Sequence, residues 1–304
     1  MQELMVYAGQ LDCYERCNEV IREFTDVEVS TTQIYRLTDK YGTELEKEVN
    51  KEVVLPSLKQ QETLYVQADG SMLQTREEGY KEVKVGRLFK SSDCMHSTGK
   101  AGWIKTSQYV AHLGNSKAFT DQMDSLIESY GKRGDQLIFV SDGALWIKNW
   151  IADAFPDAVS ILDYYHACEH LHQFSSTYFS DKQQERAWVS EQKELLLQSE
   201  VLRVTQNIEQ LAGNSNEAQQ LIAYYQSNKE RMDYKRYQQI GCGIIGSGAI
   251  ESAHRTVVQK RMKQSGQRWS IQGAQHMLNL RVIRKNRQWN KVIQLAKQQF
   301  VAAA

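Results

Sequence analysis

The chain has 304 residues, of which 41% are hydrophobic and 10% aromatic, and this composition excludes a disordered protein. Its 37 lysines and arginines balance 37 aspartates and glutamates, and five unevenly spaced cysteines indicate reduced thiols rather than a secreted disulfide framework. No apolar run approaches the ~18–20 residues that cross a membrane. No export signal is visible at the N-terminus, so we expect a cytoplasmic protein.

Residues 1–58 are predicted to form a helical N-terminal region. Apolar residues from Leu11 to Phe24 recur at spacings of three and four, which places them on one helical face. The next segment begins near Ser30, with Gly42 as a plausible stop, and has the outline of a helix-turn-helix DNA reader. A plain helical hairpin that packs on the next domain is an equally good interpretation, because acidic residues follow instead of a basic surface.

The period of the pattern changes after residue 60. Apolar and polar residues alternate over residues 64–70, which predicts a half-buried strand that carries Asp69, with Asp69 and Gly70 as a turn signal. Residues 82–90 and 107–113 are predicted to be the second and third strands of an antiparallel meander.

Helices and strands alternate from Ser116 onwards. A helical stripe ending at Gly131 is followed by a buried strand over residues 136–140, a helix over 145–155 and a buried strand over 158–162. The order is β-β-β-α-β-α-β, so we predict an α/β fold with a mixed five-stranded sheet and helices on its faces.

Three parts of the chain follow from this order of elements. Residues 59–163 are predicted to be the first part of the α/β domain. Residues 164–240 form an all-helical insertion. Residues 241–304 begin with a glycine-rich segment and continue as a basic, helical C-terminus.

The charge of the chain is strongly polarised. Asp and Glu are absent from residues 252–304, which contain eleven bases, so the first 251 residues carry a net charge of −11 (37 − 11 = 26 bases against 37 acids). Phosphate backbones are the natural counter-charge for such a run. The candidate DNA-binding residues are Arg255, Lys260, Arg261, Lys263, Arg268 and Trp269. Trp269 either stacks on an unpaired base or fills the core.

Four acids stand where they could share a metal ion. Asp142 and Asp163 follow buried strands, Asp69 lies on the first strand of the same sheet, and Glu251 opens the basic helix. Such a set of carboxylates suits Mg²⁺, and two such ions can activate the attacking oxygen and stabilise the leaving oxygen of a phosphodiester. Taken singly, each aspartate is better interpreted as a turn or cap residue.

Two other motifs were weighed against this interpretation. The Gly-x-Gly-x-x-Gly sequence over residues 241–246 lacks the preceding strand and the following acid of a dinucleotide site, so we reject it. His166 and His170 share a helical face and could bind zinc, but Cys168 lies on a different face. A polar helix face near Asp142 and Asp163 is favoured over a structural zinc site.

The motifs also carry a family resemblance. Residues 141–171 and 231–281 resemble bacterial insertion-sequence transposases of the Kra group, which are DDE-type enzymes and relatives of the mutator-like transposases. The shared features are an acid before Gly-Ala and a helix, an Asp-x-x-His about twenty residues later, and Gly-Ser-Gly-x-x-Glu-Ser at the start of a basic helix. The resemblance covers roughly residues 60–290.

The resemblance implies an RNase H-like catalytic core. Asp69, Asp142 and Glu251 would be its catalytic residues and the ligands of two Mg²⁺ ions, for which Mn²⁺ can substitute. Asp163 and His166 match the supporting Asp-x-x-His signature, and the helical stretch matches an insertion that family members place before the glutamate. Such transposases usually carry a longer N-terminal region, so a truncated or partial reading frame is one interpretation of this chain.

The expected function is therefore DNA transposition, in which a transposon end is nicked and its 3′-hydroxyl attacks target DNA. An RNase H-like nuclease without strand transfer is the first alternative, and a catalytically silent DNA-binding derivative is the second. The partners would be transposon ends and target DNA. Joining two ends requires at least a dimer, and DNA binding would place the protein at the bacterial nucleoid.

Overall fold

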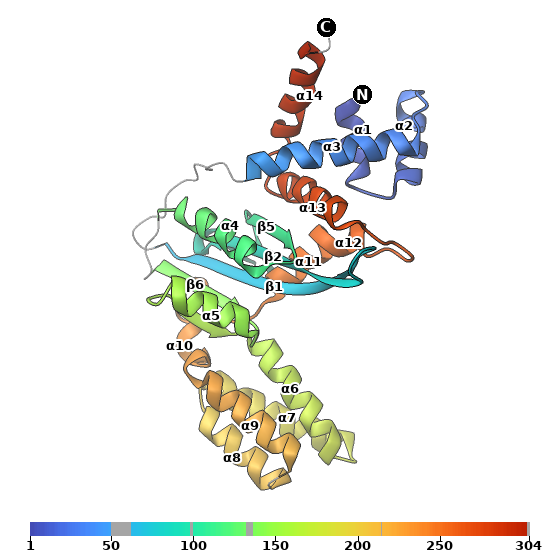
Figure 1. Cartoon of the computed structure of the whole chain (residues 1–304). Helices are drawn as coiled ribbons and strands as arrows, with labels where there is room; N and C mark the ends of the chain where they lie inside the picture. The colour runs from blue at the N-terminus through green and yellow to red at the C-terminus, as the bar shows by residue number, and fades with distance from the viewer. Residues whose placement is uncertain (50–61, 98–99, 132–135, 214, 303–304) are drawn as a thin grey trace.

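The fold is built around a mixed five-stranded sheet with the strand order β5-β2-β1-β6-β7 (Figure 1). The computed structural model describes residues 1–49, 62–97, 100–131, 136–213 and 215–302. The strands are β1 (Leu64–Gln74), β2 (Tyr80–Lys90), β5 (Gln108–Leu113), β6 (Leu137–Ser141) and β7 (Val159–Leu162). β2 runs antiparallel to β1 and β5, whereas β6 and β7 run parallel to β1. The predicted α/β class and the five-stranded mixed sheet are confirmed.

Helices cover both faces of this sheet. α4 (Ser116–Glu128) and α5 (Leu145–Ala154) pack on the face to which β1 contributes Leu64, Val66 and Ala68. Because side chains alternate along a strand, Asp69 lies on the other face. On that face, near β2 and β5, the sheet packs against α11 (Gly248–His254), the π-helical turn η4 (Arg255–Gln259), α12 (Lys260–Met262) and α13 (Ile271–Lys285).

The segment between β7 and α11 is a helical body that stands away from the sheet (Figure 1). Its elements are α6 (Tyr164–Tyr178), α7 (Lys182–Leu197), α8 (Val201–Ala212), α9 (Asn216–Asn228), the 3-10 turn η3 (Lys229–Arg231) and α10 (Tyr234–Tyr237). Buried Arg231 ties its end to the sheet by donating hydrogen bonds to Ser160 Oγ at 3.0 Å and Ser141 Oγ at 2.9 Å. The helical insertion therefore begins and ends beside the carboxyl ends of β6 and β7.

The N-terminal helices lie at the opposite end of the molecule, beside the C-terminal helices (Figure 1). They are α1 (Gln2–Gly9), α2 (Tyr14–Thr25) and α3 (Thr31–Val49), and the last C-terminal helix is α14 (Asn290–Ala302). α3 packs along α13, where Asn279 Nδ2 donates to Gly42 O at 3.2 Å. This is the arrangement of a helical hairpin that packs on the next domain. The predicted boundary near residue 58 lies outside the described residues.

Several local predictions were wrong. Gly42 does not stop a helix but lies inside α3, where a Cβ would meet the backbone of His276 at 2.6 Å. Phe24 is 85% exposed and does not share the buried face of α2. Asp69 and Gly70 are not a turn, because β1 continues to Gln74 paired with Tyr80 of β2.

One pair of strands was not predicted. β3 (Cys94–Ser97) and β4 (Lys100–Ile104), which follow β2 and precede β5 along the chain, form a separate two-stranded sheet. Their segment lacks the regular alternation that marks the strands of the main sheet.

Candidate active site

The parallel strands bring three aspartates to one edge of the sheet. β1 pairs with β6 from Leu64↔Leu137 to Gln67↔Val140, and this register, extended by two residues, sets Asp142 beside Asp69. β6 pairs with β7 up to Ser141↔Leu162, which sets Asp163 beside Asp142. The backbone supports this placement, since Asp163 N donates to Ser141 O at 2.8 Å.

The charges of neighbouring acids affect the pKa of Asp69. Burial raises the pKa of Asp69, and the negative charges of Asp142, Glu82 and Glu251 add to this effect, whereas the Gly70 N–H opposes it; the net pKa is about 6. That N–H donates to Asp69 Oδ1 at 2.7 Å. Asp142 and Glu251 are among the acids whose charges raise this pKa, which agrees with the choice of Asp142 as the second aspartate. The structure thus brings the three predicted catalytic acids into one electrostatic cluster.

Asp142 also has a local role. Its Oδ1 accepts a hydrogen bond from Ala144 N at 3.0 Å, just before α5 begins at Leu145. The capping interpretation of Asp142 and its membership of the acid cluster are therefore compatible, because a carboxylate has a second oxygen.

Glu251 lies exposed in the first turn of α11, and the glycine-rich segment before that helix is fixed to the sheet. Gln67 Nε2 donates to Gly246 O at 3.1 Å, and Arg87 donates to Ala249 O at 2.7 Å. The element before this segment is the short helix α10, not a strand, in agreement with the rejection of a dinucleotide motif.

Asp163 positions this helix start. It is 3% exposed, and its Oδ1 accepts from Tyr165 N at 2.8 Å to cap α6. Its other oxygen accepts a short hydrogen bond from Ser247 Oγ. One buried carboxylate thereby joins the end of β7, the start of α6 and the segment that leads to Glu251. Through these contacts Asp163 positions the segment that leads to Glu251.

His254 is a site residue that the sequence reasoning missed. It is 3% exposed and follows Glu251 by almost one helical turn, on the buried face of α11. Its Nε2 lies 3.2 Å from Asp69 O and 3.4 Å from Asp69 Oδ2, and its Nδ1 lies 3.1 Å from Ser71 Oγ. Burial lowers the pKa of His254 to about 4, so the ring is neutral at pH 7. The sequence signal was a histidine three residues after the candidate glutamate.

His166 is not drawn into the acid cluster in the same way. Its side chain is 36% exposed, and its Nδ1 lies 3.5 Å from Glu169 of the same helix. The ring also contacts His170, with 4.8 Å between centroids. Cys168 is buried in the core on another face, which disfavours the zinc site considered from the sequence.

The side chains of the acids are not gathered closely enough to form a complete metal site. Within the described parts of the chain, no group of three or more His, Cys, Asp and Glu side chains is close enough to hold a metal ion. The donor chemistry nevertheless fits a hard divalent cation, since Asp69, Asp142 and Glu251 offer carboxylate oxygens whose mutual repulsion a cation would relieve.

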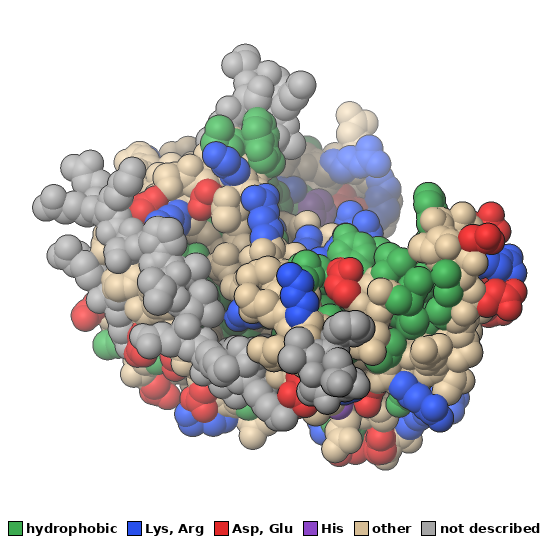
Figure 2. All heavy atoms as spheres, turned by 90° about the horizontal axis from the view of Figure 1, so that it is seen from above, with side chains coloured by type: hydrophobic (Ala, Val, Ile, Leu, Met, Phe, Trp, Pro, Cys, Tyr) green, Lys and Arg blue, Asp and Glu red, His purple; other side chains and the backbone are tan. Residues whose placement is uncertain are grey.

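The candidate DNA-binding residues divide into two groups. Arg255, Lys260, Lys263 and Arg268 are exposed. On the face seen in Figure 2, Lys and Arg side chains gather towards the middle, and Asp and Glu lie mainly towards the rim. Burial lowers the pKa of Lys263 and the charge of Asp69 raises it, so this lysine lies close to the acid cluster.

One predicted DNA contact, Arg261, needs correction, and the structure bears on the two interpretations of Trp269. Arg261 is 1% exposed and its Nε donates to Gly9 O at 2.9 Å, so it is not a surface base. Trp269 packs over the Arg261 guanidinium at 5.0 Å and donates from Nε1 to Met262 O at 3.0 Å. These contacts favour the core-filling interpretation of Trp269. Arg261 was misplaced because its partner Gly9 lies 252 residues away in the sequence.

Comparison with known proteins gives a family without an assigned activity. The model of the uncharacterised protein family UPF0236 matches residues 2–299, and the chain therefore belongs to this family. No curated protein matches the chain. Within the described residues, no helix is both long enough and apolar enough to span a membrane.

Proposed function

We propose that this member of family UPF0236 is a DDE-type DNA transposase with Asp69, Asp142 and Glu251 as its catalytic acids. The observation that carries the proposal is the register of β1 and β6, which sets Asp142 beside Asp69, together with the packing of the Glu251 helix on the same face of the sheet. Burial and the nearby charges of Asp142, Glu82 and Glu251 accordingly raise the pKa of Asp69 to about 6. Functional carboxylates are often gathered in this way, at a cost to the stability of the fold.

The sheet supports the same proposal. The strand order β5-β2-β1-β6-β7, in which only β2 runs antiparallel to the other four strands, is the arrangement we assign to an RNase H-like core. In such a core the acids lie on the central strand, after the next strand and on a helix that packs against the sheet. Asp69, Asp142 and Glu251 occupy these three kinds of position.

The three acids would hold two Mg²⁺ ions. When bound, these ions would activate the attacking oxygen of a phosphodiester displacement and stabilise the oxygen that leaves. The pKa of Asp69 is low enough for the carboxylate to be ionised at pH 7, as a metal ligand must be.

The remaining residues would position the acids and the DNA. His254 fixes the backbone and side chain of Asp69, and Asp163 fixes the start of the helix that carries Glu251. Lys263 is the base best placed to bind a phosphate at the acid cluster, since its charge interacts with Asp69. Exposed Arg255 and Lys260 would bind phosphates of the DNA backbone that flank the acid cluster.

Cleavage and binding assays test the assignment together. Asp69→Asn, Asp142→Asn and Glu251→Gln are each expected to abolish Mg²⁺-dependent cleavage of duplexes that carry the transposon end, by at least about a hundredfold, while DNA binding is largely retained. The matched control is Asp153→Asn, at an exposed position of α5, which should cleave normally. Near-normal cleavage by one of the three variants would remove that residue from the site.

The products separate the proposal from its alternatives. Joining of the 3′-hydroxyl to target DNA is expected of a transposase, and it requires two ends and hence at least two copies of the chain. Cleavage without joining would favour a nuclease, and binding without cleavage a silent DNA-binding derivative. A DNA-bound protein would be found at the bacterial nucleoid, which imaging of a tagged chain can check.

A further inference from the structure

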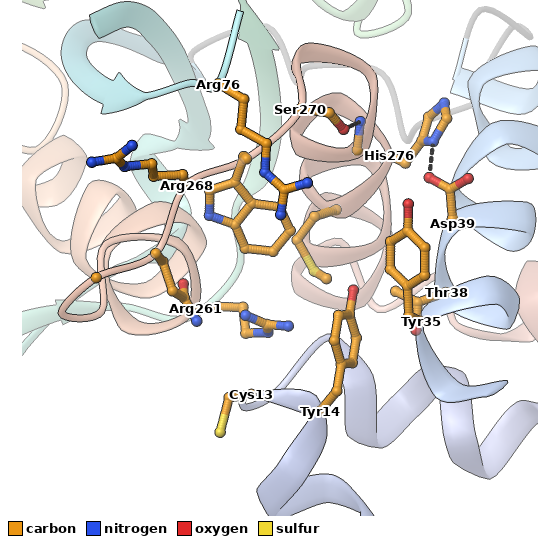
Figure 3. Close-up of a pocket in the computed structure, with 15 residues that line it drawn as sticks. Cys13, Tyr14, Tyr35, Thr38, Asp39, Arg76, Arg261, Arg268, Ser270 and His276 are labelled. Atoms are coloured by element: carbon orange, nitrogen blue, oxygen red, sulfur yellow. Dashed lines mark hydrogen bonds and ion pairs between the residues drawn. The ribbon is translucent and has the colours of Figure 1, made fainter. Parts of the chain in front are cut away.

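A cavity of about 500 Å³ lies away from the acid cluster, between the N-terminal helices and the basic C-terminal part (Figure 3). It is lined by residues of α2, α3, α12 and α13, by the segment between α12 and α13, and by Arg76 just after β1. Its volume is that of a pocket for a small organic ligand. The residues that matter for its chemistry are Tyr14, Tyr35, Arg76, Arg261, Arg268 and Trp269.

The first unusual feature of this cavity is the charge of Arg261. Its guanidinium lies 4.9 Å from the ring centroid of Tyr14 and 5.0 Å from that of Trp269, and the residue is 1% exposed. No carboxylate in the described part of the chain forms an ion pair with it. The two rings and Gly9 O cover this guanidinium, so Arg261 adds positive charge to the wall of the cavity rather than a contact with a ligand.

Two further arginines of the cavity are accessible to an anionic ligand. Arg76 and Arg268 are exposed, come from different segments and both line the cavity; the Arg76 side chain points into it, whereas that of Arg268 lies at its margin and points outward (Figure 3). The carboxylate of Asp39 also lines it, but His276 Nδ1 lies 2.7 Å from Asp39 Oδ1. The cavity therefore has an excess of positive charge.

The aromatic lining indicates the shape of the ligand. Tyr14 and Tyr35 meet edge to face, with 5.8 Å between ring centroids, and Tyr35 is 46% exposed. Aromatic side chains stack on planar bases, and arginines beside them bind phosphate. A nucleotide carries both a planar base and a negatively charged phosphate.

We propose that this cavity receives an unpaired nucleotide of the DNA strand, with its base against Tyr35 and its phosphate at Arg76 and Arg268. This proposal rests on the proposed function, because a protein that acts on DNA ends would have a DNA strand close to this cavity. The cavity and the acid cluster share one strand: Thr75 of β1 bridges to Trp269, and Asp69 lies six residues earlier. At about 3.3 Å per residue, the two sites are roughly 20 Å apart along β1. A DNA end can therefore reach both sites at once.

Binding of the full-length protein to short duplexes in EDTA tests the proposal without requiring catalysis. A duplex with a single-stranded overhang of a few nucleotides, at its 3′ or its 5′ end, is expected to bind about tenfold more tightly than the blunt duplex. Arg76→Gln combined with Arg268→Gln should abolish this preference, and Tyr35→Ala should reduce it. The matched control is Lys297→Gln on α14, outside the cavity, which should leave the ratio of the two affinities unchanged.

Further experiments distinguish a nucleotide of the DNA strand from a free nucleotide. An abasic site at one overhang position should remove most of the preference if a base enters the cavity. Equal affinities for blunt and overhanging duplexes, or a preference that survives the Arg76 and Arg268 substitutions, would overturn the proposal. Binding of dAMP without any overhang preference would make the cavity a site for free nucleotides and likewise overturn it. Failure of the catalytic proposal would instead appear as absent cleavage despite a retained overhang preference.

Discussion

Asp69 lies between a residue that orders it and residues that repel its charge. His254 lies close to both its backbone oxygen and its Oδ2, and these contacts hold the side chain in place on β1. The charges of Asp142 and Glu251, together with burial, disfavour the ionised form. At the scale of single residues, the site is thus ordered by a neutral histidine and strained by like charges. A bound cation would reverse the second effect.

This strain predicts how stability depends on pH. The folded pKa of Asp69, about 6, exceeds its ordinary value of 3.8, so the ionised carboxylate destabilises the fold above pH 6, and this penalty disappears as the pH falls below 4. Asp69→Asn should therefore stabilise the metal-free protein at pH 7, by on the order of 1 kcal/mol after allowance for the partly exposed side chain. Urea denaturation at pH 7 and at pH 5 would measure the gain, which should shrink at the lower pH. A gain that does not change between these two pH values would contradict the assigned cause, and Asp153→Asn is again the control.

At the scale of elements, the sequence predicts what repeats along a helix or strand. Alternation identified β1, and the continuous apolar runs identified β6 and β7, because these patterns follow directly from which faces are buried. The same logic placed Asp142 and Asp163 at the strand ends. The start of α11 at Gly248 agrees with the glycine-rich sequence before Glu251, but Ser247 does not cap this helix, because its hydroxyl donates to Asp163 instead.

Contacts between distant parts of the chain were not predictable in this way. Arg261 and Gly9 are 252 residues apart, and their hydrogen bond depends on how the N-terminal helices pack on the C-terminal ones. Gly42 has the same origin: it resembles a helix stop locally, but its real constraint is the backbone of α13. A pattern along one segment cannot report a contact with another segment.

The packing of α3 on α13 gives a prediction with a matched control. At Gly42, a Cβ would lie 2.5 Å from His276 Cβ and 2.6 Å from His276 O, and the backbone of α13 cannot move aside easily. Gly42→Ala is expected to lower the free energy of unfolding by about 1–3 kcal/mol, despite the better helix propensity of alanine. At Gly248 no atom lies within 4 Å of the added Cβ, so Gly248→Ala should be neutral or slightly stabilising. Denaturant unfolding of both variants would test this, and equal effects would show that α3 does not pack closely on α13.

At the scale of the whole molecule, opposite charges occupy different parts of the chain. Residues 252–304 carry eleven bases and no acid, yet the structure withdraws some of these bases from the surface. Arg261 is one, and Arg281, 5% exposed, is another, since its guanidinium donates to backbone oxygens that include Gln10 O and Thr256 O. The charge available to DNA is therefore smaller than the count suggests, and the buried arginines join the two ends of the chain.

This division predicts the salt dependence of DNA binding. Each base that binds a phosphate contributes about 0.9 to the slope of the logarithm of the association constant against the logarithm of the salt concentration. Arg255→Gln and Lys260→Gln, at exposed positions beyond Glu251, should each reduce the magnitude of that slope by about 0.9. Arg203→Gln on α8 is the matched control, because it removes an exposed arginine of the helical insertion. Fluorescence anisotropy over a range of NaCl concentrations measures all three slopes. If Arg203→Gln reduced the slope as much as the other two substitutions, the DNA would contact the insertion as well, and the basic C-terminal part would not be its main binding surface.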